Sequence, residues 1–172
     1  MRAEDAKTIA DFLVSAMEGE VPATTAVLSA VPADRTDYRP DSKSKSALGL
    51  ARHITLEDEW FLEMVTQAEF LPPPDDSDSC GVMTPKDAAA RYSDRIPKRL
   101  ARIRALPGEH LAREVELFGG MVKMPVVGVL SLAMRHSTHH RGQLSSYLRA
   151  MGGKVPPIYG PSADTQQQAA AV

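Results

Sequence analysis

The segment Pro125–Met151, which reads PVVGVLSLAMRHSTHHRGQLSSYLRAM, predicts a long helix with one buried face. Its inward positions recur at helical spacing and are Val126, Val129, Leu130, Ala133, His136, His140, Leu144, Tyr147, Leu148 and Met151. Such a stripe is typical of a helix that packs against other helices. Pro125 suits the first turn of this helix, and Gly152 suits its C-cap. The segment therefore favours a helical bundle.

Three further helices are predicted upstream, at about Glu4–Leu28, Ser46–Phe70 and Pro85–Leu106. Thr84 is a suitable N-cap for the third of them. In the first helix the apolar positions with helical spacing are Ile9, Phe12, Leu13, Ala16 and Met17. Pro97 predicts a kink or an early end of the third helix, because proline lacks the N–H that continues a helix.

The region between residues 109 and 124 carries a different pattern. Acidic and apolar residues alternate over residues 114–117, and Gly119-Gly120 follows, which predicts a short hairpin. We therefore predict an all-α fold, an antiparallel four-helix bundle over residues 1–161 with a short hairpin before the last helix. Residues 162–172 are low in complexity, and we predict a disordered C-terminal tail there.

Composition excludes several classes of protein. The 172 residues include 20 basic and 22 acidic side chains, a net charge of −2, and the charges are interspersed. Nucleic-acid binding needs a clustered basic surface, and a membrane span needs roughly 18 apolar residues in a row, so we expect neither partner. A single cysteine, Cys80, excludes an internal disulfide. Without a signal-peptide pattern at the N-terminus, we expect a cytoplasmic protein.

Histidines on the inner side of the last helix indicate a metal site. His136 and His140 are one turn apart, so their imidazoles lie side by side on one helix face. His53 is the other histidine on the apolar face of a predicted helix, and His139 lies to the side of the stripe. We predict that His53, His136 and His140 bind a divalent metal. Three neutral ligands leave a coordination position open, as in catalytic zinc sites, and the spacing leaves Zn, Ni, Cu and Fe open.

Three polar neighbours are candidates for supporting roles. Glu57, one turn after His53, is a candidate general base or an orienting partner for a ligand, and a solvated helix-edge carboxylate is the alternative. Gln143, one turn after His140, is a candidate for a hydrogen bond at the site. Tyr147 is a candidate to contact a bound cofactor or ligand, with a core tyrosine as the alternative. The sequence has no His-Glu-x-x-His motif, which excludes a zinc protease of that type. It has no Glu-x-x-His motif either, which disfavours a di-iron bundle of the ferritin type.

Two segments resemble a known family. Residues 38–53, with Tyr38-Arg39-Pro40-Asp41-Ser42 and Ala47–His53, and residues 136–149, HSTHHRGQLSSYLR, are similar to the DinB/YfiT-like superfamily of metal-dependent enzymes. The resemblance implies a four-helix bundle with a long crossover. It also implies a divalent ion, nickel or zinc, bound by His53, His136 and His140. Lys45 stands where many members of the family carry a tryptophan.

The resemblance also suggests an activity. Several branches of the family transfer a low-molecular-weight thiol, such as bacillithiol, mycothiol or glutathione, and the ion would lower the pKa of the thiol. We therefore expect a metal-dependent thiol S-transferase acting on a small-molecule substrate. A metal-assisted hydrolase with Glu57 as base and a non-catalytic, metal-binding stress-response module are the alternatives. A homodimer formed through an exposed apolar helix face is a further expectation.

Overall fold

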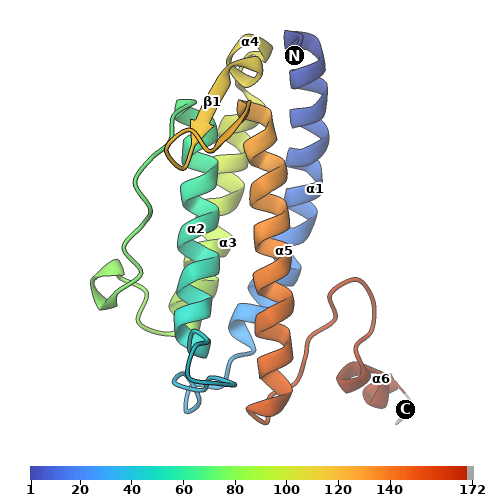
Figure 1. Cartoon of the computed structure of the whole chain (residues 1–172). Coiled ribbons are helices and arrows are strands. Elements are labelled where there is room, and N and C mark those ends of the chain that lie inside the picture. The colour runs from blue at the N-terminus through green and yellow to red at the C-terminus, as the bar shows by residue number, and fades with distance from the viewer. Residues whose placement is uncertain (170–172) are drawn as a thin grey trace.

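The computed structural model describes residues 1–169 and shows a bundle of four long helices (Figure 1). These are α1 (Ala3–Ser29), α2 (Ala47–Gln67), α3 (Pro85–Arg104) and α5 (Val126–Ala150). The smaller elements are a 3-10 turn η1 (Asp78–Cys80), α4 (Gly108–Ala112), the strands β1 (Glu114–Leu117) and β2 (Val122–Pro125), and α6 (Ala163–Ala169). The predicted four-helix bundle and its hairpin are confirmed.

Side chains at the helix ends explain where α2 and α3 begin and end. The Ser46 side chain caps α2 by accepting a hydrogen bond from the Gly49 N–H. Thr84 and Asp87 form a capping box at the start of α3, with Pro85 as its first residue. α2 ends at Gln67, three residues before the sequence predicts, and Ala68 follows in the left-handed conformation with φ of 54°.

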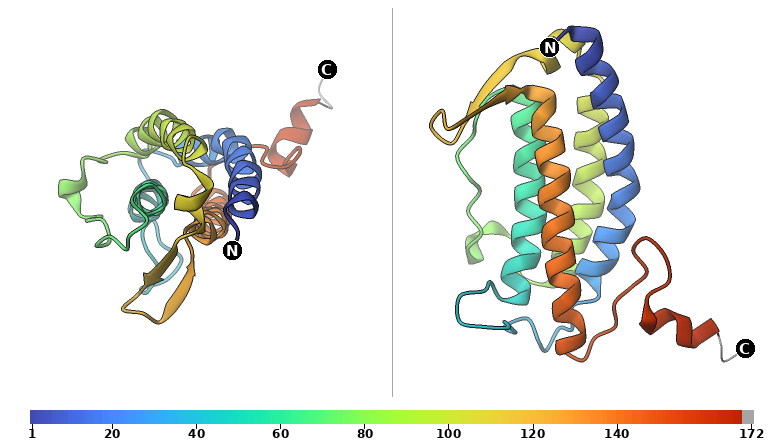
Figure 2. Two further views of the ribbon diagram at one scale, coloured as in Figure 1. Left: turned by 90° about the horizontal axis from the view of Figure 1, so that it is seen from above. Right: turned by 45° about the vertical axis from the view of Figure 1, so that its right-hand side comes forward.

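Neighbouring helices of the bundle run in both relative directions (Figure 2). The predicted antiparallel arrangement holds for α1 with α3, where Lys7 Nζ donates to the Arg104 carbonyl at 2.7 Å, and for α2 with α5. In contrast, α2 and α3 run parallel, as the successive contacts Glu59–Arg91 and Glu63–Arg99 show. Parallel neighbours need a connection that returns along the whole bundle, and residues 68–84 form this crossover.

The crossover is held to the helices by backbone carbonyls that accept hydrogen bonds from buried or half-buried side chains. Trp60 Nε1 donates to the Leu71 carbonyl at 3.1 Å, and Arg52 Nε donates to the Val82 carbonyl at 2.7 Å. Lower down, Lys45 in the α1–α2 loop forms a 2.7 Å ion pair with Asp76 of the crossover. The two long loops of the bundle therefore meet beside the start of α2.

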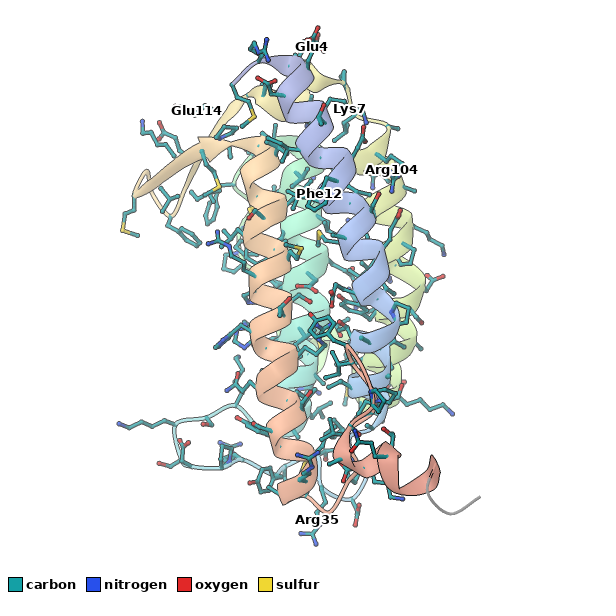
Figure 3. All side chains as sticks on the ribbon, turned by 90° about the vertical axis from the view of Figure 1, so that its right-hand side faces the viewer. Glu4, Lys7, Phe12, Arg35, Arg104 and Glu114 are labelled. Carbon is teal, nitrogen blue, oxygen red and sulfur yellow. The ribbon has the colours of Figure 1, made fainter. Side chains whose placement is uncertain are left out.

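The core forms along the predicted faces, with two departures. Leu13 and Met17 of α1 are buried, but Phe12 is 72 % exposed and Ile9 is 38 % exposed. The inward stripe predicted for α1 is therefore too wide, and Figure 3 shows Phe12 on the outer side of α1. Pro97 lies inside α3, which continues past it to Arg104, so the predicted early end is wrong. Because Pro97 is on the exposed side of the helix, water can solvate the carbonyl that loses its partner there.

The hairpin and the C-terminal segment complete the description. In the hairpin, Leu117 of β1 pairs with Val122 of β2, and Gly119 and Gly120 take the positive φ values that the turn requires. Residues 163–169, within the segment predicted as a disordered tail, form α6. Asp164 holds this helix to the bundle by accepting from Arg149 Nε at 3.1 Å and from the Val155 N–H at 3.0 Å. The last three positions of the predicted tail, 170–172, lie outside the described residues.

Within residues 1–169, every helix is too short or too polar to cross a membrane.

Candidate metal centre

Three histidines from two antiparallel helices converge at one point of the bundle. His53 of α2 points at His136 and His140 of α5, and its Nε2 lies 3.2 Å from the Nε2 of each. One ring nitrogen from each of the three lies within 4.8 Å of the other two. The structure thus brings together the three residues that spacing and resemblance single out.

The spacing of these nitrogens suits a metal ion. When three nitrogens bind one zinc ion tetrahedrally at about 2.0–2.1 Å, they lie about 3.3 Å from one another. The observed separations of 3.2 Å are close to this value. His53 Nε2 cannot satisfy both neighbours with one hydrogen, because a neutral imidazole has a single N–H and a single acceptor nitrogen. A cation between the rings satisfies all three nitrogens at once.

The outer nitrogen of each imidazole faces an oxygen. His140 Nδ1 lies 3.0 Å from Gln143 Oε1, which can only accept, so His140 carries its hydrogen on Nδ1 and its lone pair on Nε2. His53 Nδ1 lies 3.8 Å from a Glu57 oxygen, and His136 Nδ1 lies 3.7 Å from an Asp58 oxygen. Oxygen partners on Nδ1 are the usual support of metal-binding histidines, because they leave Nε2 free for the ion.

Burial favours the neutral forms of His53 and His140 in the absence of metal. Burial, together with the adjacent His140 and His136, lowers the pKa of His53 to about 4. Burial also lowers the pKa of His140, against the opposing effect of its hydrogen bond to Gln143. Neutral imidazoles are the form that binds metals, so protons compete weakly for these two rings near neutral pH.

The three candidate supporting residues lie at different distances from the histidines. Glu57 is half-buried beside His53, and burial raises the pKa of its carboxyl group, so it is not the solvated edge residue of the alternative interpretation. Gln143 touches His140 directly. Tyr147 is one contact further away: it is buried, and its hydroxyl lies 3.4 Å from Gln143 Nε2 and 3.5 Å from the Lys45 carbonyl. The roles proposed for these residues stay predictions.

The other histidines and the cysteine do not belong to the cluster, although the ring of His139 packs against that of His140 with centroids 4.7 Å apart. His139 is exposed on the outer side of α5, as its position outside the stripe predicts. His110 lies in α4, where its Nε2 is 2.8 Å from the Val65 carbonyl. Cys80 belongs to η1 in the crossover. A cavity of about 390 Å³ beneath the crossover is lined by Trp60 and its neighbours, and none of the three ligand histidines contributes to it.

Two residues at the site are missed by the sequence analysis. Asp58 is fully buried beside His136, and the hydroxyl of Tyr92 in α3 donates to its other oxygen at 2.8 Å. Asp58 follows Ile54 by four residues and precedes Phe61 by three, so an acid interrupts the buried stripe of α2. A buried acid within an apolar stripe is rare enough to have marked this residue. Phe61 itself packs edge-on against His136, with ring centroids 5.1 Å apart.

Comparison with known proteins agrees with this architecture. The family model described as the DinB family matches residues 8–170. The chain is 29 % identical over 139 residues to the uncharacterized protein YjoA of Bacillus subtilis, a match that covers 79 % of this chain and 86 % of YjoA. The crystal structure of YjoA, a DinB-like protein, superposes with a TM-score of 0.69 at 26 % identity and covers 87 % of this chain and 99 % of YjoA.

Two more distant structures share the fold. A DinB-like protein from Bacillus cereus has a TM-score of 0.70 at 21 % identity, over 86 % of this chain and 95 % of that one. YfiT from Bacillus subtilis, described as a probable metal-dependent hydrolase with an unusual four-helix bundle topology, has a TM-score of 0.65 at 16 % identity, over 90 % and 91 %. With the family model spanning nearly the whole sequence, the chain belongs to the DinB family.

Proposed function

We propose that this protein is a divalent-metal-dependent enzyme in which His53, His136 and His140 hold the ion and leave one coordination position for a nucleophile. The observation that carries the proposal is the convergence of three Nε2 atoms from half-buried rings, 17–18 % exposed for His53 and His136. A fully enclosed structural site would have a fourth protein ligand, and within residues 1–169 the cluster consists of these three side chains.

The chemistry divides between the ion and the side chains around it. A bound divalent cation supplies a Lewis acid that lowers the pKa of a nucleophile placed beside it. Glu57, 17 % exposed and with a raised pKa, is placed to accept the proton that the nucleophile loses. Gln143 fixes the ring of His140. Nickel and zinc remain the two metals that the family resemblance favours.

The nucleophile we propose first is a low-molecular-weight thiol of the bacillithiol, mycothiol or glutathione type. The resemblance to thiol-transferring branches of the family supports this choice, together with the open coordination position. The carboxylate of Glu57 takes the thiol proton, and the sulfur then forms a bond to a small electrophile. The product is the S-substituted thiol. In a substitution the leaving group departs with the electron pair of its broken bond and takes the proton from Glu57, whereas in an addition the electrophile takes that proton.

Hydrolysis is the second candidate, with water in place of the thiol. It is supported by the half-buried carboxylate of Glu57 beside His53 and by the description of the structurally similar YfiT as a probable metal-dependent hydrolase. The same residues serve both reactions, so only substrates distinguish them.

The deciding experiment compares nucleophiles on one protein preparation. Metal-free protein is reloaded with one equivalent of nickel or zinc and mixed with each thiol and monochlorobimane, then with a panel of esters, amides and phosphates. We expect thiol consumption that depends on metal and disappears in His136→Ala but persists in His139→Ala, the matched control at the exposed histidine next to His140 that is not part of the cluster. Hydrolysis without thiol transfer would favour the second candidate. One bound metal without either activity would leave the non-catalytic binding module as the function.

The homodimer is a further proposal that a single residue can test. Phe12, 72 % exposed on α1, is the apolar side chain through which a second copy would pack. Light scattering should then report a dimer for the native chain and a monomer for Phe12→Ser. A monomeric native chain would contradict this proposal without affecting the metal site.

A further inference from the structure

Two buried polar atoms face each other at the back of the metal centre without hydrogen-bond partners. They are Asp58 Oδ1 on α2 and His136 Nδ1 on α5, 3.7 Å apart. Among the described residues, the only other buried side-chain atom in this condition is Thr25 Oγ1. Two of these three buried atoms without hydrogen-bond partners therefore lie in contact with each other, and one of the two is the Nδ1 atom of the predicted metal ligand His136.

A fully buried carboxylate without a positive partner is costly, and native proteins seldom leave one in this state. Moving the two atoms together by less than 1 Å would give an ordinary N–H···O bond. Ligating histidines usually donate this hydrogen to a carboxylate, which fixes the ring and its tautomer. The 3.7 Å contact between Asp58 and His136 therefore holds the two partners of such a bond, separated by slightly more than a hydrogen-bond distance.

Tyr92 determines which oxygen of Asp58 faces His136. Its hydroxyl donates to Asp58 Oδ2 at 2.8 Å and lies 3.4 Å from Ser137 Oγ. Burial and the neighbouring Asp58 raise the pKa of Tyr92, so the hydroxyl keeps its proton and remains a donor. With Oδ2 occupied, Oδ1 is the atom left for His136. Tyr92 thus connects α3, which supplies none of the three histidines, to the metal centre.

We infer that Asp58 is a positioning residue for the metal, acting through His136, and that Tyr92 holds Asp58 in place for this task. The carboxylate accepts the Nδ1 hydrogen of His136, so His136 Nε2 presents its lone pair to the ion. The negative charge of the Asp58 carboxylate also attracts the positively charged ion, from which it is separated by one imidazole ring. This inference rests on the proposed metal site and adds a second layer of residues to it.

The test measures the dissociation constant for zinc by competition with a chromophoric chelator, in four proteins: native, Asp58→Asn, Tyr92→Phe and the double variant. Both substitutions keep the size of the side chain. In Asp58→Asn the Tyr92 hydroxyl continues to donate to the amide oxygen, so the NH2 group faces His136 and cannot accept its Nδ1 hydrogen. Loss of an outer partner of a metal ligand usually weakens binding about 10–100-fold, and we expect this loss for Asp58→Asn. Tyr92→Phe should weaken binding less. Because Tyr92 acts through Asp58, the double variant should bind zinc no more weakly than Asp58→Asn alone.

A second readout separates positioning from general damage to the core. In zinc-loaded native protein, the nitrogen NMR spectrum should show a hydrogen on His136 Nδ1 in a hydrogen bond to a carboxylate, and Asp58→Asn should shift this signal. Tyr38→Phe is the control: it removes the hydroxyl of a tyrosine whose ring packs edge-on against Tyr147, with centroids 5.7 Å apart, and it should bind zinc as the native chain does.

The possible results test the positioning role of Asp58 and the metal site separately. Native zinc affinity in Asp58→Asn, or losses that add fully in the double variant, would overturn the positioning role while leaving the three-histidine site intact. A native protein that binds no zinc or nickel would overturn the metal site and, with it, this inference.

Discussion

Gln143 Oε1 accepts the Nδ1 hydrogen of His140 at 3.0 Å, one turn further along the same helix. Both residues belong to the segment from which the fold is predicted, and the contact gives Gln143 a role in orienting the ring of His140. Gln143 is a neutral acceptor, whereas the outer nitrogens of the other two ligands face carboxylates.

Gln143→Leu should weaken metal binding, because the leucine cannot accept the hydrogen of His140 and the ring loses its fixed orientation. We expect a loss of about 10–100-fold in affinity, measured by chelator competition. Gln143→Glu keeps an acceptor at the same place and should bind at least as tightly as the native chain. Equal affinities for the leucine and native proteins would refute this role.

Acid should destabilise the metal-free protein through His53. Its pKa is about 4 in the folded chain and 6.5 when unperturbed, so between these pH values the unfolded chain binds more protons than the folded chain. The stabilising contribution is complete above pH 6.5 and is lost as the pH falls toward 4. For one such group, the free energy of unfolding falls by up to about 1.4 kcal/mol per pH unit within that window.

Denaturant titrations of metal-free protein at several pH values test this prediction. His53→Gln should show a shallower dependence, with a remaining slope of the same sign from His140, whose pKa is also lowered. An identical pH dependence in both proteins would contradict it. In loaded protein, the low pKa of His53 implies that the ion is retained at pH 6 and released further toward pH 4.

Glu59 should be important for the parallel pairing of α2 and α3. It is 5 % exposed and pairs with Arg91 at 2.6 Å, Arg95 at 3.3 Å and Arg99 at 3.4 Å. Glu59→Gln leaves these guanidinium groups without their buried counter-charge, and since they are partly hydrated we expect a loss of about 2–3 kcal/mol in the free energy of unfolding. Glu116→Gln, at an exposed pair with Lys123, is the control and should be neutral. Equal stability of the two variants would be the contrary result.

Arg141 should contribute to stability and not to metal binding, although it follows His140 directly. Its buried guanidinium pairs with Glu20 of α1 and donates to Thr24 Oγ1 at 3.2 Å. Arg141→Leu should lose about 2–4 kcal/mol in the free energy of unfolding and still bind one metal per chain by elemental analysis. Arg149→Leu, at an exposed position of the same helix, is the control for stability. Loss of metal from folded Arg141→Leu protein would assign this arginine to the site instead.

The sequence predicts the elements and the ligands because both depend on local periodicity. The i, i+4 spacing of His136 and His140 places both on one face, and His53 is the histidine on the apolar face of another helix. The parallel pairing of α2 and α3 is not local: it depends on where residues 68–84 take the chain, and no repeat in the helices encodes that path. The pairing of Asp58 with Tyr92 is likewise not local, since Tyr92 lies 34 residues away on another helix.

The exposed position of Phe12 shows a second limit. Periodicity identifies an apolar face but not its width, and width depends on how closely the neighbouring helices approach. Residues at the edges of the predicted stripe, such as Ile9 and Phe12, are therefore predicted to be buried although they are exposed.

The order of the helices around the bundle has a consequence for how the chain folds. Among the long helices, α1 packs on α3 and α5, and α2 packs on α5 and α3, so successive helices α1 and α2 lie diagonally opposite (Figure 2). No two consecutive long helices of the described chain close as a simple antiparallel hairpin, and most tertiary contacts must wait for distant segments. Loop-closure entropy slows such folds, so this bundle should fold more slowly than an up-and-down bundle of the same length. The metal centre, which joins residues more than 80 positions apart, should be among the last parts to form.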